Sequence, residues 1–253
     1  MKAIILAAGR GTRMGAVTRD QPKCLTEIGG RRLLAWQIAA LREAAVDNIT
    51  IIGGYRKELL EPYADRILEN TRWAETNMVA TLALASEILR HHDCIISYSD
   101  ILYHPEIIRV LSVSKADIAI TYDLEWKSLW SDRFDDPGDD AEGFEEKNGV
   151  LISIGAKPKS INEVEGQYMG LLKISPPGWL EIENYLSGIG QGRTDRLDMT
   201  GLLAGLLNNN RPIETIAIAG KWCEIDNQTD LELYRCKIAE GENWTHDWRW
   251  ETA

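Results

Sequence analysis

The chain has 253 residues, of which 44% are hydrophobic, so it is long enough to bury a sizeable core as one large α/β domain. Its formal net charge of −11 excludes broad nucleic-acid binding, which needs a basic face that releases counterions. The apolar stretches are too short to span a membrane, the N-terminus lacks a signal-peptide pattern, and the four cysteines show no C-x-x-C spacing. We therefore expect a cytoplasmic protein with reduced thiols, no membrane contact and small-molecule partners.

Strands and helices alternate along the first half of the chain. Continuous apolar runs predict buried parallel strands at residues 2–8, 48–54, 93–101 and 116–123. Apolar residues at helical spacing predict helices at residues 31–46, 76–92 and 104–114. Thr76 or Asn77 is placed to cap the second of these helices, and Pro105 suits the first turn of the third. Residues 57–66 predict a short helix or turn, broken by Pro62.

The second half begins with an acidic, turn-rich segment at residues 130–149, which predicts an inserted loop or hairpin. The elements predicted after it are strands at 149–155 and 167–175, helices at 178–189 and 198–210, strands at 212–220 and 221–226, and a helix at 228–240. This alternation predicts an α/β fold with a doubly wound, mostly parallel sheet, which binds ligands at the carboxyl ends of its strands.

The segment ILAAGRGTRMGAVTRDQPKCL, residues 5–25, runs from the first strand into glycines and cations. The glycines let the backbone approach a ligand closely, and the cations suit an anionic one. A dinucleotide-binding loop is disfavoured, because Met14 stands where the third glycine of that fingerprint belongs. The second strand also ends in glycines instead of an acidic residue, and the Walker pattern is absent.

LAAGRGTRM followed by QPKCL resembles the signature of nucleotidyltransferases that join a nucleoside monophosphate to a phosphorylated small molecule. Two further motifs match, YSD at residues 98–100 and WCEID at residues 222–226, so the resemblance spans residue 3 to about residue 236. It implies a Rossmann-like nucleotidyltransferase fold. Residues 1–236 are then a single domain, with a nucleotide-binding half at 1–125 and an acceptor-side half at 126–236. A Trp-rich tail at 237–253 packs on its own domain or on a second subunit, and its apolar content favours a homodimer.

The resemblance also assigns roles to residues. Arg13 and Lys23 would bind phosphate oxygens as the catalytic cations, and Asp100 and Asp226 would hold Mg²⁺. The residues expected to bind the nucleotide are Leu6, Ala7, Ala8, Gly9, Gly11, Thr12, Asn77 and Tyr98. The acceptor oxygen would attack the α-phosphorus in line, and no side-chain nucleophile or general base is required, because that oxygen is already ionised.

Finer resemblance favours a cytidylyltransferase that uses CTP. ETNMVATLALA is similar to a segment of phosphocholine cytidylyltransferases, and ISIGAKP with EGQYMGLLKIS is similar to 2-aminoethylphosphonate and phosphoglutamine cytidylyltransferases, the latter serving capsule decoration. The implied acceptor-binding residues are Lys157, Asp198, Trp130 and Tyr168. In the acidic segment, Trp126 and Trp130 could stack on an ammonium group, which could also meet the carboxylates of Asp132, Asp135, Asp136 and Glu142.

Structural alternatives stay open for several of these residues. Asn77, Asp100, Asp198 and Asp226 could each serve as a helix cap or turn residue, the acidic segment could be a solvated loop, and the two tryptophans could pack it down. Two functional alternatives also remain. One is a sugar-1-phosphate nucleotidyltransferase using UTP, GTP or dTTP, and the other is a catalytically silent nucleotide-binding scaffold. The joint presence of both cations and both aspartates argues against the scaffold.

Overall fold

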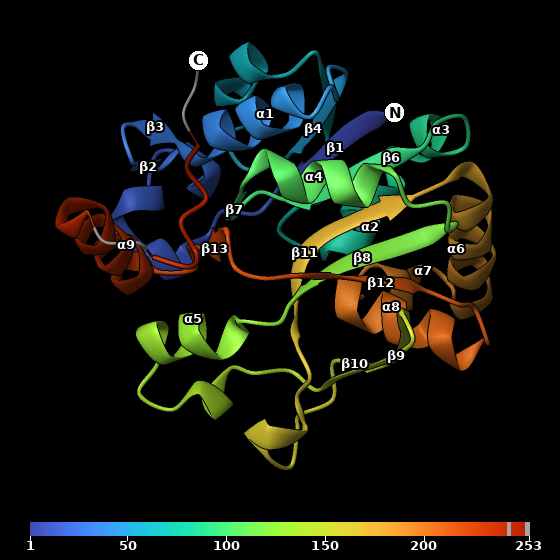
Figure 1. Cartoon of the computed structure of the whole chain (residues 1–253). Coiled ribbons are helices and arrows are strands. Elements are labelled where there is room, and N and C mark those ends of the chain that lie inside the picture. The colour runs from blue at the N-terminus through green and yellow to red at the C-terminus, as the bar shows by residue number, and fades with distance from the viewer. Residues whose placement is uncertain (242–243, 251–253) are drawn as a thin grey trace.

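A computed structural model of the protein describes residues 1–241 and 244–250. Its centre is a nine-stranded sheet covered by helices (Figure 1). In spatial order the strands are β5 (Arg66–Glu69), β4 (Ile49–Gly53), β1 (Lys2–Ala7), β6 (Cys94–Tyr98), β11 (Gln167–Ile174), β8 (Ile118–Asp123), β12 (Glu214–Ile218), β10 (Val150–Ile154) and β9 (Phe144–Lys147). Two small sheets pair β2 (Glu27–Ile28) with β3 (Arg31–Arg32) and β7 (Ile101–Tyr103) with β13 (Trp222–Glu224).

The sheet is mixed and largely parallel. Strand β1 runs parallel to β4 and β6, β4 runs parallel to β5, and β12 runs parallel to β8. Strand β11 is inserted antiparallel between β6 and β8, and β9 and β10 form an antiparallel hairpin at one edge. The predicted α/β, doubly wound architecture is therefore confirmed.

Helices cover both faces of this sheet. They are α1 (Leu33–Glu43), α2 (Met78–Ala83), α3 (Ser86–Leu89), α4 (Pro105–Ser112), α5 (Trp126–Arg133), α6 (Pro176–Ile189), α7 (Gln191–Thr194), α8 (Met199–Asn208) and α9 (Gln228–Glu240). Helices α1 and α4 contact each other, whereas α2, α3, α6 and α8 form a second group of mutually contacting helices (Figure 1). None of the described helices combines the length and apolarity needed to cross a membrane.

The parallel strands β1 and β6 bring two loops to one edge of the sheet. In β1, the residues from Ala3 to Ala7 are all buried, as the continuous apolar run predicted. Leu6 of β1 lies opposite Tyr98 of β6, so the chain leaves both strands at the same level. The glycine-rich loop and the YSD motif therefore lie side by side, although about 90 residues separate them in the sequence.

Three local details differ from the sequence prediction. The helix expected at 76–92 is divided into α2 and α3, with Leu84 and Ala85 between them. Two 3-10 turns at Lys57–Leu59 and Glu61–Tyr63 match the predicted short helix or turn, but the sequence did not predict the short edge strand β5 that follows them. The acidic segment contains the end of a helix, α5, and the first strand and the turn of the β9–β10 hairpin. Asn148 and Gly149 turn that hairpin with φ of 55° and 78°, as an Asn-Gly turn requires.

The Trp-rich tail packs on its own domain. Trp248 is fully buried, and its ring lies 6.3 Å from that of Trp36 on α1. His246 is also fully buried, and its Nε2 lies 2.8 Å from Oδ2 of Asp123 at the end of β8. The boundary expected between residues 236 and 237 falls inside α9, which continues to Glu240. Residues 242–243 and 251–253 of the predicted tail lie outside the described residues.

Candidate active site

The loop after β1 folds tightly over Lys23. Gly11 has a φ of 73° and precedes a 3-10 segment at Thr12–Thr18, a conformation that glycine adopts without steric cost. A Cβ atom at Gly11 would lie 2.6 Å from the Cβ of Lys23, so a larger residue would displace the lysine. The carbonyl of Gly11 accepts hydrogen bonds from the Met14 amide and the Thr18 hydroxyl, which hold the loop in place. The glycine is therefore required by both backbone conformation and close packing.

Lys23 lies between two carboxylates from distant parts of the sequence. Its Nζ is 2.8 Å from Oδ2 of Asp100 and 2.8 Å from Oδ1 of Asp226. Asp100 lies in the turn between β6 and β7, and Asp226 lies between β13 and α9. Strands β7 and β13 pair antiparallel, and the amide of Ile225 donates to the carbonyl of Asp100. This pairing fixes the two carboxylates on either side of the ammonium group.

Several charged groups lie around Asp226 and shift one another's pKa values. Burial alone would lower the pKa of Lys23, but Asp100 and Asp226 hold it above its ordinary value, so the ammonium form persists. Burial would raise the pKa of Asp226, yet hydrogen bonding from Glu224 and the cations Lys23 and Arg13 lower it. Arg13 contributes two contacts to Asp226, at 3.1 Å from Nη1 and 3.0 Å from Nη2. Burial and the adjacent Asp226 raise the pKa of Glu224 well above its ordinary value.

A cleft of about 220 Å³ opens above this cluster. The predicted site residues that line it are Leu6, Ala8, Gly9, Gly11, Arg13, Lys23, Asn77, Tyr98, Asp100 and Asp226. Lining residues to which the sequence reasoning assigned no role in the site are Trp73, Thr76, Met78, Thr81 and Ser99. Asn77 also caps α2, where its side chain accepts a hydrogen bond from the Met78 amide at 2.8 Å. The capping alternative for Asn77 is thus confirmed, and the side chain still borders the cleft.

Several other predicted residues do not line this cleft. Ala7 is buried within β1, and Thr12 begins the 3-10 segment. Tyr168 packs edge-on against Tyr98, with ring centroids 6.0 Å apart. Asp198 caps α8 by accepting a hydrogen bond from the Gly201 amide, which confirms its capping alternative. Lys157 is exposed in the loop after β10.

The tryptophans of the acidic segment are core residues. Trp126 is 1% exposed and Trp130 is 4% exposed. The ring of Trp130 lies 6.0 Å from that of Trp126 and 6.3 Å from that of Trp222, so neither face is open to an ammonium group. The expectation that Trp130 stacks on the acceptor is therefore wrong, and the packing alternative holds. Sequence reasoning could not see this, because the enclosing ring comes from a strand more than 90 residues away.

The acidic side chains of the same segment have different surroundings. Asp132 forms an ion pair with Lys237 of α9 at 3.0 Å. Asp136 accepts a hydrogen bond from the amide of Gly138 and caps a short 3-10 turn. Glu142 has an exposed surface, but partial desolvation raises its pKa, and the nearby carboxylates of Asp198 and Asp140 raise it further, against a hydrogen bond from Thr200. Of these three residues, Glu142 is the one that lies among other carboxylates.

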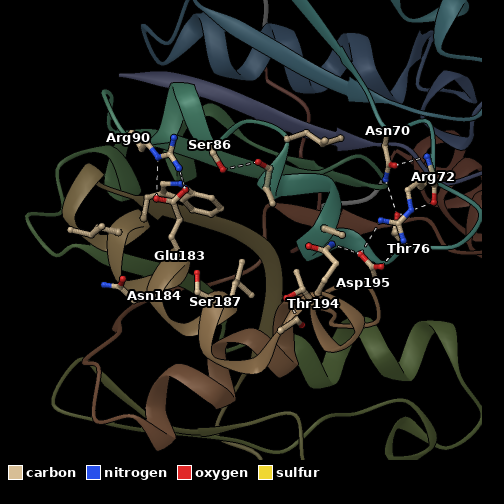
Figure 2. Close-up of a pocket in the computed structure, with 18 of the residues that line it drawn as sticks. Asn70, Arg72, Thr76, Ser86, Arg90, Glu183, Asn184, Ser187, Thr194 and Asp195 are labelled. Atoms are coloured by element: carbon tan, nitrogen blue, oxygen red, sulfur yellow. Dashed lines mark hydrogen bonds and ion pairs between the residues drawn. The ribbon is translucent and has the colours of Figure 1, made fainter.

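A larger cavity of about 640 Å³ lies between α2, α3, α6 and α7 (Figure 2). It meets the site cleft only at Thr76, which lines both. Arg72 pairs with Asp195 on one side of the cavity, and Arg90 pairs with Glu183 on the other (Figure 2). None of the residues in the glycine-rich, QPKCL, YSD and WCEID motifs lines this cavity. We therefore place the active site in the smaller cleft, where the motif residues converge.

The donor set of this cleft suits Mg²⁺. Within residues 1–241 and 244–250, no group of three or more histidine, cysteine, aspartate or glutamate side chains is arranged to hold a metal ion. Asp100 and Asp226 nevertheless already direct one oxygen each at a single cation, the Lys23 ammonium. Mg²⁺ commonly uses one or two carboxylates together with substrate phosphates and waters. The two aspartates therefore fit a metal that completes its coordination with a bound triphosphate.

Comparison with known proteins gives a consistent result. Residues 3–126 match the model of the MobA-like NTP transferase domain. The chain is 34% identical over 249 residues to the CTP:phosphoglutamine cytidylyltransferase of Campylobacter jejuni, covering 92% of this chain and 98% of the relative. It is 42% identical over 93 residues to the choline-phosphate cytidylyltransferase of Streptococcus pneumoniae, covering 35% and 41% of the two chains. The structure of the inositol-1-phosphate CTP transferase from T. maritima has the same fold, with a TM-score of 0.74, 20% identity and coverage of 95% and 96%.

Proposed function

Because this chain belongs to the cytidylyltransferase family of nucleotidyltransferases, we propose that it transfers CMP from CTP to a small phosphorylated or phosphonylated acceptor. A phosphate or phosphonate oxygen of the acceptor attacks the α-phosphorus of CTP. A new P–O bond forms, the bond between the α-phosphorus and the bridging oxygen breaks, and pyrophosphate leaves. The observation that carries the proposal is the Lys23 ammonium, held 2.8 Å from both Asp100 and Asp226 beside the glycine-rich loop.

The residues of the cleft have complementary roles in this reaction. Backbone amides from Ala8 to Thr12 lie in the loop that would receive the triphosphate. Lys23 and Arg13 would bind phosphate oxygens and offset the charge that develops during the transfer. Asp100 and Asp226 would hold Mg²⁺, which neutralises the phosphates when it is bound. The acceptor oxygen is already ionised at neutral pH, so the site needs alignment and charge compensation and no general base.

We propose an acceptor that carries an ammonium group. The curated relatives include enzymes named for phosphoglutamine, choline phosphate and 2-aminoethylphosphonate, all nitrogen-bearing acceptors. In this chain the carboxylates of Asp198 and Asp140 both raise the pKa of Glu142, at one end of the acidic segment. Like charges placed together repel, and a cation between them relieves that repulsion. This arrangement supports a cationic headgroup on the acceptor. The headgroup would lie near the reacting phosphate, because the charge of Asp226 also raises the pKa of Asp140.

Pyrophosphate release in the presence of Mg²⁺ tests the proposal. CTP, UTP, GTP, ATP and dTTP are each combined with phosphocholine, 2-aminoethylphosphonate, phosphoglutamine, glucose-1-phosphate and 3,3-dimethylbutyl phosphate. The last compound has the shape of phosphocholine without the positive charge of its ammonium group. We expect release with CTP and one nitrogen-bearing acceptor, and little with the uncharged analogue. Release only with a sugar phosphate would replace the proposal with the sugar-nucleotide alternative, and nucleotide binding without turnover would point to the scaffold.

A further inference from the structure

A buried arginine lies directly beneath the proposed catalytic carboxylate. Arg133 is the last residue of α5, and its side chain has no exposed surface. Its Nε and Nη2 each lie 3.1 Å from a different carboxylate oxygen of Asp230, so the pair is bidentate. Nη2 also lies 3.6 Å from Glu224 and 3.6 Å from Asp226. One guanidinium group thus serves three carboxylates.

The surroundings of Arg133 keep it in this position. Its guanidinium carbon lies 5.2 Å from the ring centroid of Trp130 and 5.0 Å from that of Phe134. The planar group is therefore enclosed by aromatic rings and held by a bidentate carboxylate, two contacts that suit arginine better than lysine. Burial of an ion pair adds little to stability by itself, because desolvation offsets the attraction. The buried charge of Arg133 is therefore better explained by a role toward the carboxylates of the proposed site than by a contribution to stability.

Arg133 also acts on the backbone that carries Asp226. Its partner Asp230 accepts hydrogen bonds from the amides of Asp226, at 2.8 Å, and Asn227, at 3.2 Å. Asp230 and Asn227 form the capping box that begins α9. Arg133 thus connects the acidic segment to the turn between β13 and α9, through its contact with Asp230, which is 97 residues away in the sequence.

We propose that Arg133 is a positioning residue that supplies the fixed counter-charge of Asp226, an inference that rests on the proposed function. In the structure, Lys23 and Arg13 neutralise Asp226 from the open side of the cleft. Both are expected to share their charge with the phosphates when CTP binds, which weakens their neutralisation of Asp226 beside Glu224. Arg133 is enclosed on the opposite side and stays in place. It keeps the carboxylate oriented while the two cations of the open side also contact the phosphates.

The test compares Arg133→Met, Arg133→Lys and Asp230→Asn with the wild type. Mn²⁺ binding is titrated by electron paramagnetic resonance with CTP present, and kcat and KM are measured by pyrophosphate release. We expect Arg133→Met to weaken Mn²⁺ affinity and lower kcat by roughly tenfold to a hundredfold, the range seen when partners of metal ligands are lost. The KM for the acceptor should remain near its wild-type value. Arg133→Lys should recover part of both losses, and Asp230→Asn should resemble Arg133→Met.

Arg90→Met is the matched control, because Arg90 also forms a bidentate pair, with Glu183, but on the surface and away from the site. It should leave Mn²⁺ affinity and kcat unchanged. Wild-type Mn²⁺ affinity and kcat in folded Arg133→Lys and Asp230→Asn would overturn the proposal, even if Arg133→Met did not fold. The Mn²⁺ titration needs no turnover. An inactive wild type would therefore count against the proposed function. The difference in Mn²⁺ affinity between the Arg133 variants and the wild type would still test the role of Arg133.

Discussion

At the scale of single residues, the active site is organised around one ammonium group. A lysine has three N–H donors, and among the described residues the Nζ of Lys23 donates to Asp100 and Asp226. One donor is therefore left for a ligand in the cleft. The carboxylates keep the lysine charged at every pH at which the protein is expected to work, because they raise its pKa despite burial. Lys23 is thus suited to charge compensation and poorly suited to act as a base.

Replacing Lys23 with methionine should remove this compensation. We expect kcat/KM for the CTP reaction to fall by roughly a hundredfold to a thousandfold, as when one preorganised donor to a transition state is lost. Lys221→Met is the matched control, because Lys221 pairs with Glu106 on the surface. Initial rates of pyrophosphate release measure both variants, and melting curves check that they fold. A Lys23→Met enzyme within threefold of the wild type would remove this lysine from the mechanism.

Glu142→Gln tests the proposed cationic acceptor at a single carboxylate. Loss of one partly solvated charge contact is worth about 1 kcal/mol, so KM for the acceptor should rise roughly fivefold while KM for CTP stays unchanged. The control is Glu145→Gln, an exposed glutamate in β9, three residues further along the chain. Equal effects of the two substitutions on KM for the acceptor would contradict a specific role for Glu142.

At the scale of elements, the loop after β1 is specified by where its glycines lie. Gly11 and Gly9 are two residues apart, yet only Gly11 has a positive φ and a close neighbour at its missing Cβ. The two positions therefore separate the effect of losing a glycine from the effect of displacing Lys23.

Gly11→Ala should destabilise the protein by about 1–3 kcal/mol, because alanine at positive φ is strained and its methyl group meets Lys23. Gly9→Ala has open space around the added carbon, and its effect on stability should stay within about 0.5 kcal/mol. Urea unfolding at neutral pH measures both. Equal stabilities for the two variants would show that the loop relaxes around the added methyl group.

The C-terminal segment 244–250 is a second element whose contribution can be isolated. Trp248 is buried among aromatic rings that include Trp36, Tyr234 and Trp244. Trp248→Ala should lower the free energy of unfolding by about 3–5 kcal/mol, the usual cost of removing a large buried ring. Leu180→Ala, at a residue 56% exposed on α6, should change it by less than about 0.5 kcal/mol. A small effect at Trp248 in urea unfolding would mean that the tail is not part of the cooperative core.

At the scale of the whole molecule, one buried carboxylate joins the sheet, the β13 region and the tail. Asp123 ends β8 and accepts hydrogen bonds from Gly220, Trp222 and His246. Burial alone would raise the pKa of Asp123, but these hydrogen bonds, that of His246 foremost, hold it below its ordinary value. Segments that are far apart in the sequence thus share one partner.

The lowered pKa of Asp123 makes its contribution depend on pH. The stabilisation is complete above the unfolded pKa of about 3.9 and is lost as the pH falls through the lower folded pKa. The free-energy difference between the wild type and Asp123→Asn should therefore be constant from pH 7 to 5 and shrink below about pH 4. Urea unfolding at several pH values measures it. A difference that stays constant down to pH 3 would mean that Asp123 is not charged in the folded protein.

The sequence by itself determined the fold class and the central residues of the proposed site. Apolar runs at alternating spacing were sufficient for the fold class, because strand–helix alternation produces a doubly wound sheet. The glycine-rich, QPKCL, YSD and WCEID motifs pointed to Lys23, Asp100 and Asp226 through their resemblance to nucleotidyltransferases. Only the tertiary structure decided the burial of Trp130 and the position of Arg133. Both depend on partners about a hundred residues away, and no local pattern distinguishes an enclosed tryptophan or arginine from an exposed one.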